Sequence, residues 1–235
     1  MKKVVHKSDT RGHANHGWLE SFHSFSFANY YNPNKMNFGL LRVLNDDSVA
    51  AGRGFGAHPH DNMEIISIPL EGDLEHQDNM GNKTVIKLND VQIMSAGTGV
   101  LHSEYNHSRK DAVKFLQIWV FPKEKNIKPR YAQKTFEPAD RENKLQLVVS
   151  PEHEEAIWIN QDAYFSLGKF EAGKTVSYEI HKNGNGAYIF VLDGKVEVDG
   201  EVFDKRDAVG VWDTDKVNIK AAENTNFLVI DVPMN

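Results

Sequence analysis

Along the 235 residues of this chain, apolar, β-branched and aromatic residues come in short runs that turn residues interrupt. Four such runs cover residues 38–44, 64–70, 84–88 and 113–121, with Gly, Asn, Asp or Pro around them. Runs of this length and composition are typical of β-strands. No segment sustains a helical period, so the sequence predicts an all-β protein.

The two halves of the chain resemble each other, which indicates a duplicated β-sandwich unit. Gly72 and Gly194 each follow an apolar run, and the apolar segments that begin at Asp90 and Asp207 also match. The residues between the halves are rich in Pro, Lys and Glu. We therefore expect three parts: an N-terminal metal-binding domain (1–121), a connection (122–141) and a C-terminal domain (142–235).

No cysteine occurs in the chain, which excludes disulfides, iron–sulfur ligation, thiolate nucleophiles and cysteine-rich zinc sites. The formal net charge is -6 and no stretch concentrates Lys and Arg, so we expect no direct binding to nucleic acid. The basic start is not followed by an apolar signal core, and no apolar run is long enough to span a bilayer. These features predict a cytoplasmic protein without membrane contact, and we expect it to be a monomer.

Two pairs of possible metal ligands occur at i, i+2 spacing: His58 with His60, and His102 with Glu104. On a β-strand, residues at this spacing point to the same face, so two neighbouring strands would bring four ligand side chains together. A single His-x-His pair is more often a surface feature, but here a Gly-rich segment that permits close strand approach precedes each pair. Three imidazoles and one carboxylate suit Fe(II), Mn(II), Co(II), Ni(II), Cu(II) or Zn(II), with positions left open for substrate or oxygen.

Glu64 is a second candidate for the carboxylate ligand. It lies four residues after His60 and shares its face if the strand alternates without interruption. Its other possible place is beside the site, where a carboxylate can orient an imidazole.

The second half of the chain lacks this pattern. Mostly apolar residues occupy the positions that correspond to the four ligands: Ile180, Lys182, Ile219 and Ala221. We therefore expect one metal per chain, in the N-terminal domain, and an ordinary strand position for His181.

Two longer motifs surround the candidate ligands. The segment Gly52-x5-His58-x-His60-x3-Glu64 resembles the first cupin motif, and Gly97-x-Gly99-x2-His102-x-Glu104 resembles the pirin version of the second. The similarity continues in further segments: residues 11–18, 23–28, 42–47, 54–60, 76–78, 92–97 and 102–106. Together they make the chain resemble the pirin family, and most of all the bacterial pirin-like quercetinases.

The resemblance implies a bicupin, in which two jelly-roll β-sandwich barrels pack together and the N-terminal barrel holds a single metal. The family's ligand positions match His58, His60, His102 and Glu104, so the resemblance favours Glu104 over Glu64. Iron(II) is the metal we expect.

The resemblance also implies an oxidoreductase, a quercetin 2,3-dioxygenase that opens the central ring of a flavonol with molecular oxygen (O2) and releases carbon monoxide. Under this hypothesis Glu104 also takes the substrate proton as a catalytic base. The alternative is an iron-binding, redox-sensing regulator that acts through a protein partner, which is the role better known for eukaryotic pirins.

Further histidines and aromatic residues surround these motifs. Five histidines are open to two interpretations, the mouth of the pocket or a solvated surface: His13, His16, His23, His76 and His107. Four aromatic residues are expected to form core between the two lobes rather than a substrate platform: Trp18, Phe22, Phe25 and Phe27.

Overall fold

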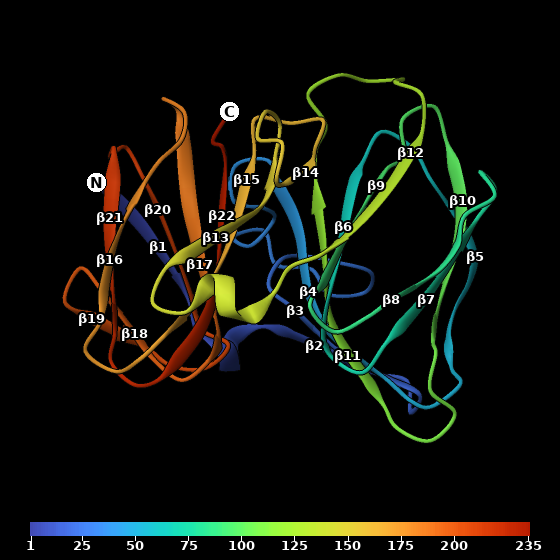
Figure 1. Cartoon of the computed structure of the whole chain (residues 1–235), viewed down its shortest axis with the longest axis horizontal. Coiled ribbons are helices and arrows are strands. Elements are labelled where there is room, and N and C mark those ends of the chain that lie inside the picture. The colour runs from blue at the N-terminus through green and yellow to red at the C-terminus, as the bar shows by residue number, and fades with distance from the viewer.

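The computed structural model describes all residues 1–235 and consists of β-strands arranged in two lobes (Figure 1). Each lobe contains a seven-stranded sheet and a four-stranded sheet. The helical turns are the short 3-10 segments η1 (Ser8–Thr10) and η2 (Pro138–Arg141), and no helix could traverse a lipid bilayer. The expected all-β class is confirmed.

The first lobe contains the strands of the candidate ligand motifs. Its larger sheet has the order β12 (Arg130–Thr135), β9 (Asp90–Ser95), β6 (Glu64–Glu71), β11 (Val113–Val120), β4 (Leu41–Val49), β3 (Leu19–His23) and β2 (Gly12–Asn15). Its smaller sheet has the order β5 (Gly54–His60), β10 (Val100–Asn106), β7 (Leu74–Asp78) and β8 (Lys83–Ile86).

The second lobe is built mainly from the C-terminal half of the chain. Its larger sheet has the order β1 (Lys2–His6), β20 (Ala208–Trp212), β17 (Asn185–Asp193), β22 (Thr225–Pro233), β15 (Tyr164–Phe170), β13 (Leu145–Ser150) and β14 (Ile157–Trp158). Its smaller sheet has the order β16 (Thr175–Glu179), β21 (Lys216–Ala221), β18 (Val196–Val198) and β19 (Glu201–Phe203).

The two lobes repeat one strand order, as the matching halves of the sequence predict. The order β5-β10-β7-β8 recurs as β16-β21-β18-β19, and β9-β6-β11-β4 recurs as β20-β17-β22-β15. The register corrects two expected correspondences: Ile219 pairs with Val176 in the way that His102 pairs with His58, and Val217 pairs with Tyr178 in the way that Val100 pairs with His60. The counterparts of His58 and His60 are therefore Val176 and Tyr178 rather than Ile180 and Lys182, because the connection between β16 and β17 is longer than that between β5 and β6.

Two edge strands come from outside the part of the chain that forms the rest of their sheet: β1 from the N-terminal half and β12 from the connection. β1 pairs with β20, and β12 pairs with β9. Such pairing satisfies N–H and C=O groups that a sheet edge would otherwise expose. The expected domain boundaries at residues 121 and 141 stay a prediction, and β1 adds the start of the chain to the sheet of the second lobe.

The largest core lies where the two seven-stranded sheets face each other, in the middle of Figure 1. This cluster of 25 buried residues draws on both halves of the chain, with Phe25 and Ile118 from the first and Val148 and Ile230 from the second. β6 and β11 are covered on both faces, and this explains why their sequences are apolar runs rather than alternating patterns. β21, at the outer side of the second lobe, alternates strictly between exposed and buried residues.

The four aromatic residues expected between the lobes divide among different sites. Phe25 is 1% exposed and belongs to the core between the lobes, as expected. Trp18 packs edge-on against Phe55 inside the first lobe, and Phe22 stacks on His13. Phe27 lines a cavity beside Trp119. For these three the expectation was wrong: Trp18 and Phe27 pack within the first lobe, and Phe22 is only half-buried and lies outside the core between the lobes.

Candidate metal centre

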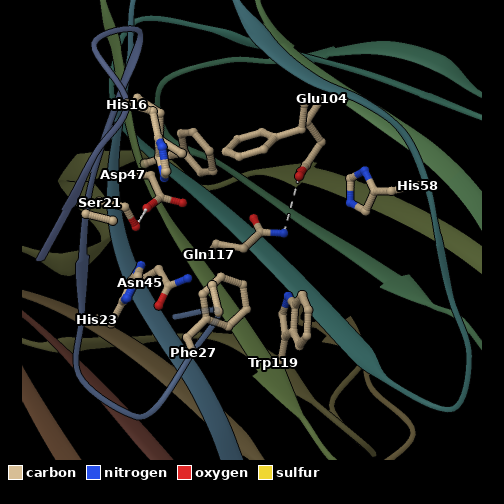
Figure 2. A pocket seen from close by; sticks show the side chains of 15 residues that line it. His16, Ser21, His23, Phe27, Asn45, Asp47, His58, Glu104, Gln117 and Trp119 are labelled. Carbon is tan, nitrogen blue, oxygen red and sulfur yellow. Dashed lines mark hydrogen bonds between the residues drawn. The ribbon is translucent and has the colours of Figure 1, made fainter. Parts of the chain in front are cut away.

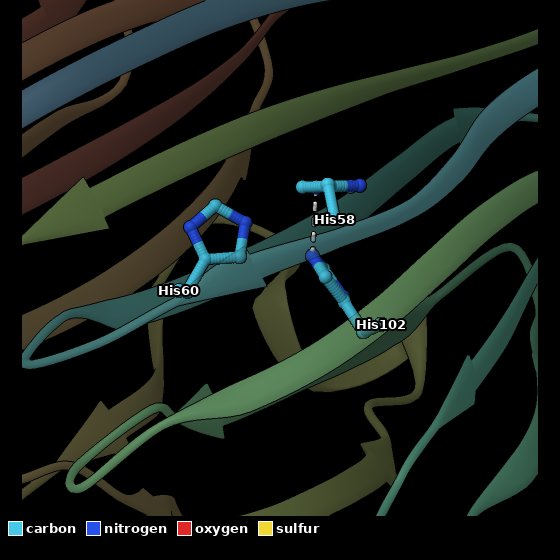
Figure 3. Close-up of side chains that lie close together, drawn as sticks. All are labelled: His58, His60 and His102. Atoms are coloured by element: carbon cyan, nitrogen blue, oxygen red, sulfur yellow. Dashed lines mark hydrogen bonds between the residues drawn. The ribbon is translucent and has the colours of Figure 1, made fainter.

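Three imidazoles converge between two strands of the smaller sheet in the first lobe (Figure 3). His58 and His60 project from β5, and His102 projects from the antiparallel strand β10 directly opposite His58. The ring centroids of the three imidazoles lie 4.5 to 4.9 Å apart, and Nε2 of His58 lies 3.1 Å from Nε2 of His102. The predicted i, i+2 pairing on neighbouring strands therefore brings these three side chains together.

The protonation of these imidazoles suits a metal ligand. Nδ1 of His58 lies 2.8 Å from the carbonyl oxygen of Gly56. Because a carbonyl only accepts, Nδ1 carries the proton and Nε2 keeps its lone pair. Burial and the nearby His58 lower the pKa of His60 to about 4, and Nε2 of His60 has no hydrogen-bond partner although it is buried. Burial and the neighbouring histidines lower the pKa of His102 to about 2. At neutral pH His60 and His102 are therefore uncharged, and each has a nitrogen lone pair that can bind a metal.

Glu104 lies two residues after His102, next to a β-bulge. The register between β10 and β5 shifts between these two residues, so Glu104 faces Phe55 rather than Gly56. A carboxylate oxygen of Glu104 lies within 4.8 Å of ligand nitrogens of His76 and His102. Burial raises the pKa of Glu104 to about 7, against the effect of nearby hydrogen bonds from Ser67 and Gln117.

Glu64 lies away from the imidazoles. Oε2 of Glu64 accepts hydrogen bonds from Ser95 Oγ at 2.8 Å and from the backbone N–H of Asn160 at 3.2 Å. Asn160 belongs to the second half of the chain, so Glu64 links the two lobes and does not orient an imidazole. Between the two candidate carboxylates, Glu104 is the one grouped with histidine nitrogens.

A glycine allows β5 and β10 to approach each other. A Cβ atom at Gly54 would lie 2.2 Å from the carbonyl oxygen of Glu104 and 2.5 Å from Cα of Tyr105. Any larger residue would therefore push the two strands apart. This bears out the role expected for the Gly-rich approach to His58.

His76 and Asp78 form a buried pair that the sequence left undecided. His76 is fully buried on β7, its ring centroid is 5.3 Å from that of His102, and its Nε2 lies 3.0 Å from Asp78 Oδ2. A carboxylate that orients an imidazole is typical of the surroundings of metal sites. The spacing of His76 and Asp78, again i, i+2, was the available signal, but only the pairing of β7 with β10 shows their place.

A cavity of about 130 Å³ opens beside the imidazoles (Figure 2). His58 and Glu104 lie on one side of it, and Gln117 and Trp119 lie between them and the opposite wall. Of the remaining histidines, His16 and His23 line this cavity. The other two lie on the surface, where each imidazole contacts a glutamate: His13 with Glu20 and His107 with Glu75.

His181 takes part in a polar network in the second lobe rather than occupying an ordinary strand position. Nδ1 of His181 lies 3.1 Å from Asp231 Oδ2, and its ring stacks on Tyr164. It follows β16, in the loop that leads to β17. The network anchors this loop on the buried carboxylate of Asp231.

Comparison with known protein families covers nearly the whole chain. Residues 4–120 match the family model Pirin, and residues 147–232 match the model of the quercetinase C-terminal cupin domain. The chain is 42% identical to a quercetin 2,3-dioxygenase of Escherichia coli K12, over 97% of this chain and 98% of that protein. It is 41% identical to a putative quercetin 2,3-dioxygenase of Pseudomonas aeruginosa, over 95% of this chain and 97% of that protein.

Solved structures give the same result for the fold. The crystal structure of YhhW from Escherichia coli superimposes with a TM-score of 0.94 at 42% identity, covering 99% of this chain and 98% of that one. The nickel(II) complex of bacterial pirin YhhW superimposes with a TM-score of 0.93 at 41% identity, covering 99% of each chain. The expected bicupin fold and the similarity to quercetin 2,3-dioxygenases are confirmed, and the chain belongs to the pirin family.

Proposed function

We propose that this chain is a metal-dependent dioxygenase that opens the ring of quercetin-like flavonols with molecular oxygen. His58, His60, His102 and Glu104 are the proposed ligands of one divalent metal. Iron(II) is the proposed native metal, and the donor set also suits Mn(II), Co(II), Ni(II), Cu(II) and Zn(II). We further propose that the protein acts as a cytoplasmic monomer, with the second lobe free of metal.

The convergence of three imidazole nitrogens, with His58 at the wall of a cavity, carries this proposal. Neutral His60 and His102 offer lone pairs, and the buried Nε2 of His60 has no partner within the protein. Buried polar atoms are normally paired, so an unpaired nitrogen facing two others fits a bound cation. When bound there, a divalent metal supplies a Lewis acid that lowers the pKa of a coordinated hydroxyl and activates it toward oxygen.

Glu104 is the proposed acceptor of the substrate's hydroxyl proton, and its neighbours accommodate both protonation states. Ser67 Oγ lies 3.1 Å from Glu104 Oε1 and 2.9 Å from Gln117 Oε1. Its single proton can be donated to only one of them at a time. Ionised Glu104 can accept from Ser67, whereas protonated Glu104 can donate to Ser67 while Ser67 donates to Gln117. Burial raises the pKa of Glu104 to about 7 in the protein without metal, and a divalent cation beside the carboxylate would lower it, so that Glu104 is ionised and can accept a proton at neutral pH.

Aromatic side chains shield this chemistry from water. Phe27, Phe55, Phe115 and Trp119 line the cavity next to the proposed ligands. The ring of Trp119 packs edge-on against that of His60, with centroids 4.9 Å apart. An apolar wall lowers the local dielectric constant, which strengthens the electrostatic interactions within the site.

The proposal is tested by oxygen uptake. Protein reconstituted with iron(II) should consume oxygen when quercetin is added. At matched metal content, the oxygen uptake of Glu104→Gln should be slower by about 100-fold or more. Glu64→Gln is the control, because its carboxylate contacts Ser95 and Asn160 rather than the imidazoles. Full iron content without any flavonol-dependent oxygen uptake would refute the enzyme and favour the regulator that acts through a protein partner. An active Glu104→Gln would discard only the assignment of the base.

A further inference from the structure

The end of the cavity away from the imidazoles is polar. It is lined by Ser21 and His23 on β3 and by Asn45 and Asp47 on β4, where Ser21 pairs with Asp47 and His23 pairs with Asn45. All four are buried, each 5% exposed or less. Figure 2 shows these four side chains on one side of the cavity and His58 with Glu104 on the other.

Two atoms at this polar end have no hydrogen-bond partner within the protein. They are Nδ1 of His23 and Oδ1 of Asn45, and both are fully buried. Oδ1 of Asp47 accepts a hydrogen bond from the hydroxyl of Ser21. The other carboxylate oxygen, Oδ2, has no hydrogen bond to a side chain of the cavity (Figure 2). Burying unpaired polar atoms is unfavourable for the folded protein, so their presence beside a cavity calls for an explanation, and a bound ligand is one.

The size and walls of the cavity indicate what that ligand is. A cavity of about 150 Å³ lined by apolar residues can hold one benzene molecule, so about 130 Å³ accommodates a single aromatic ring. Phe27 and Trp119 supply aromatic surface along its side. A ring bound between them would reach the polar end only with its edge, and that edge must carry hydrogen-bonding groups.

We propose that Ser21, His23, Asn45 and Asp47 form a subsite for a hydroxylated aromatic ring. Phenolic hydroxyls both donate and accept, which matches the amide of Asn45, the carboxyl of Asp47 and the imidazole of His23, whose roles follow the orientation of the amide and the tautomer of the ring. If the proposed function holds, the ring in the cavity is the pendant ring of a flavonol, and the two fused rings, for which about 130 Å³ leaves no room, extend out of the cavity past His58. The inference rests on the proposed function for this orientation, but the recognition of a hydroxylated ring does not require catalysis.

Three flavonols that differ only in the pendant ring provide the test. Galangin carries no hydroxyl on this ring, kaempferol carries one and quercetin carries two. Binding is measured by calorimetry with metal-free and with iron-loaded protein, and oxygen uptake is measured separately. Wild-type protein should bind quercetin roughly 10- to 100-fold more tightly than galangin, with kaempferol between them, because each hydroxyl adds a buried hydrogen bond.

Asn45→Leu removes the unpaired oxygen and keeps the side-chain size. This variant should lose most of the preference for quercetin over galangin, while its thermal unfolding midpoint stays equal to the wild-type value or rises. Asp47→Asn, which keeps an acceptor for Ser21, should reduce the preference in part. Ser48→Ala is the matched control, because the side chain of Ser48 points to the opposite face of β4 from that of Asp47. It should leave the preference unchanged.

The outcomes separate this subsite from the proposed enzyme. Preferential binding of quercetin that Asn45→Leu abolishes, without any oxygen uptake, would support the subsite and refute the enzyme. Oxygen uptake that is equal for quercetin and galangin, together with equal binding, would leave the enzyme standing and overturn the subsite. A preference that survives in Asn45→Leu and Asp47→Asn, or failure of all three flavonols to bind, would also overturn it.

Discussion

Replacing Asp47 with asparagine should stabilise the protein, and increasingly so as the pH rises. Burial raises the pKa of Asp47 from 3.8 to about 7, and the nearby Asp46 adds to this against the hydrogen bond from Ser21. Between these two pH values the folded protein binds a proton that the unfolded chain has lost, so the free energy of unfolding falls as the pH rises from about 4 to about 7. Above about pH 7 the folded protein buries an ionised Asp47, and the free energy of unfolding is lowered by the full amount.

The size of the effect follows from the two pKa values. A tenfold change in an ionisation equilibrium corresponds to about 1.4 kcal/mol, so the difference between 3.8 and about 7 corresponds to about 4 kcal/mol. Asparagine has the same shape, can still accept from Ser21 and never ionises. The stability gained by Asp47→Asn should therefore grow from about 1 kcal/mol at about pH 4.5 to about 4 kcal/mol at about pH 8.

Urea unfolding followed by tryptophan fluorescence measures this gain. Wild type and variant are compared in the presence of a chelator, so that metal release does not contribute to the pH dependence. Asp140→Asn, at an exposed position of η2, is the control and should leave the free energy of unfolding unchanged at each pH. A difference between Asp47→Asn and wild type that did not vary with pH would refute the raised pKa. A loss of stability at high pH would show that ionised Asp47 makes favourable contacts.

Three further predictions concern the metal centre. Elemental analysis after loading should find one metal per chain, and the double variant His58→Ala, His102→Ala should retain almost none; two metals per chain would be incompatible with a single site. Burial raises the pKa of Glu104 to about 7 but lowers that of His60 to about 4 and that of His102 to about 2, so acid should weaken metal binding first through Glu104. In Glu104→Gln, which has no carboxylate to protonate, acid should release the metal well below the ordinary histidine pKa of about 6.5, and half-release at that pH or above would count against His60 and His102 as ligands. Gly54→Ala should weaken metal affinity about 10-fold or more, because the added methyl group separates β5 from β10. Gly56→Ala is the control: its Cβ would meet only Tyr105 Oη at 3.9 Å, so its metal affinity in a competition titration should be nearly that of wild type.

The fold was largely predictable because its signals are local. Short apolar runs between turn residues predict strands, and matching runs around Gly72 and Gly194 predict a repeated unit. The matching strand orders of the two lobes agree with that prediction. The exchange of edge strands was not predictable, because β1 and β20 are paired across almost the whole length of the chain and neither sequence specifies the other.

The candidate site likewise has features that the sequence predicts and features that it does not. The i, i+2 pairs at His58 and His102 predict that four side chains share two strand faces, since this spacing acts within one strand. The three imidazoles do come together, whereas a bulge in β10 places Glu104 with His76 and His102. The sequence could not show that Ser67 and Gln117 hold Glu104, because these residues meet it only through the pairing of β6 with β11 and the packing of two sheets.

The sequence by itself determined the strand pattern, the duplication and the types of the candidate ligands, all of which depend on neighbouring residues. Residue spacing left Glu64 and Glu104 both open and the family resemblance favoured Glu104, but only the tertiary structure gives the physical reason: a bulge in β10 and a contact to Asn160 direct the two carboxylates to different places. It also decided that the polar residues Asn45 and Asp47 face a cavity. Burial in that cavity, which depends on strands far apart along the chain, gives these ordinary strand residues their unpaired atoms and raised pKa.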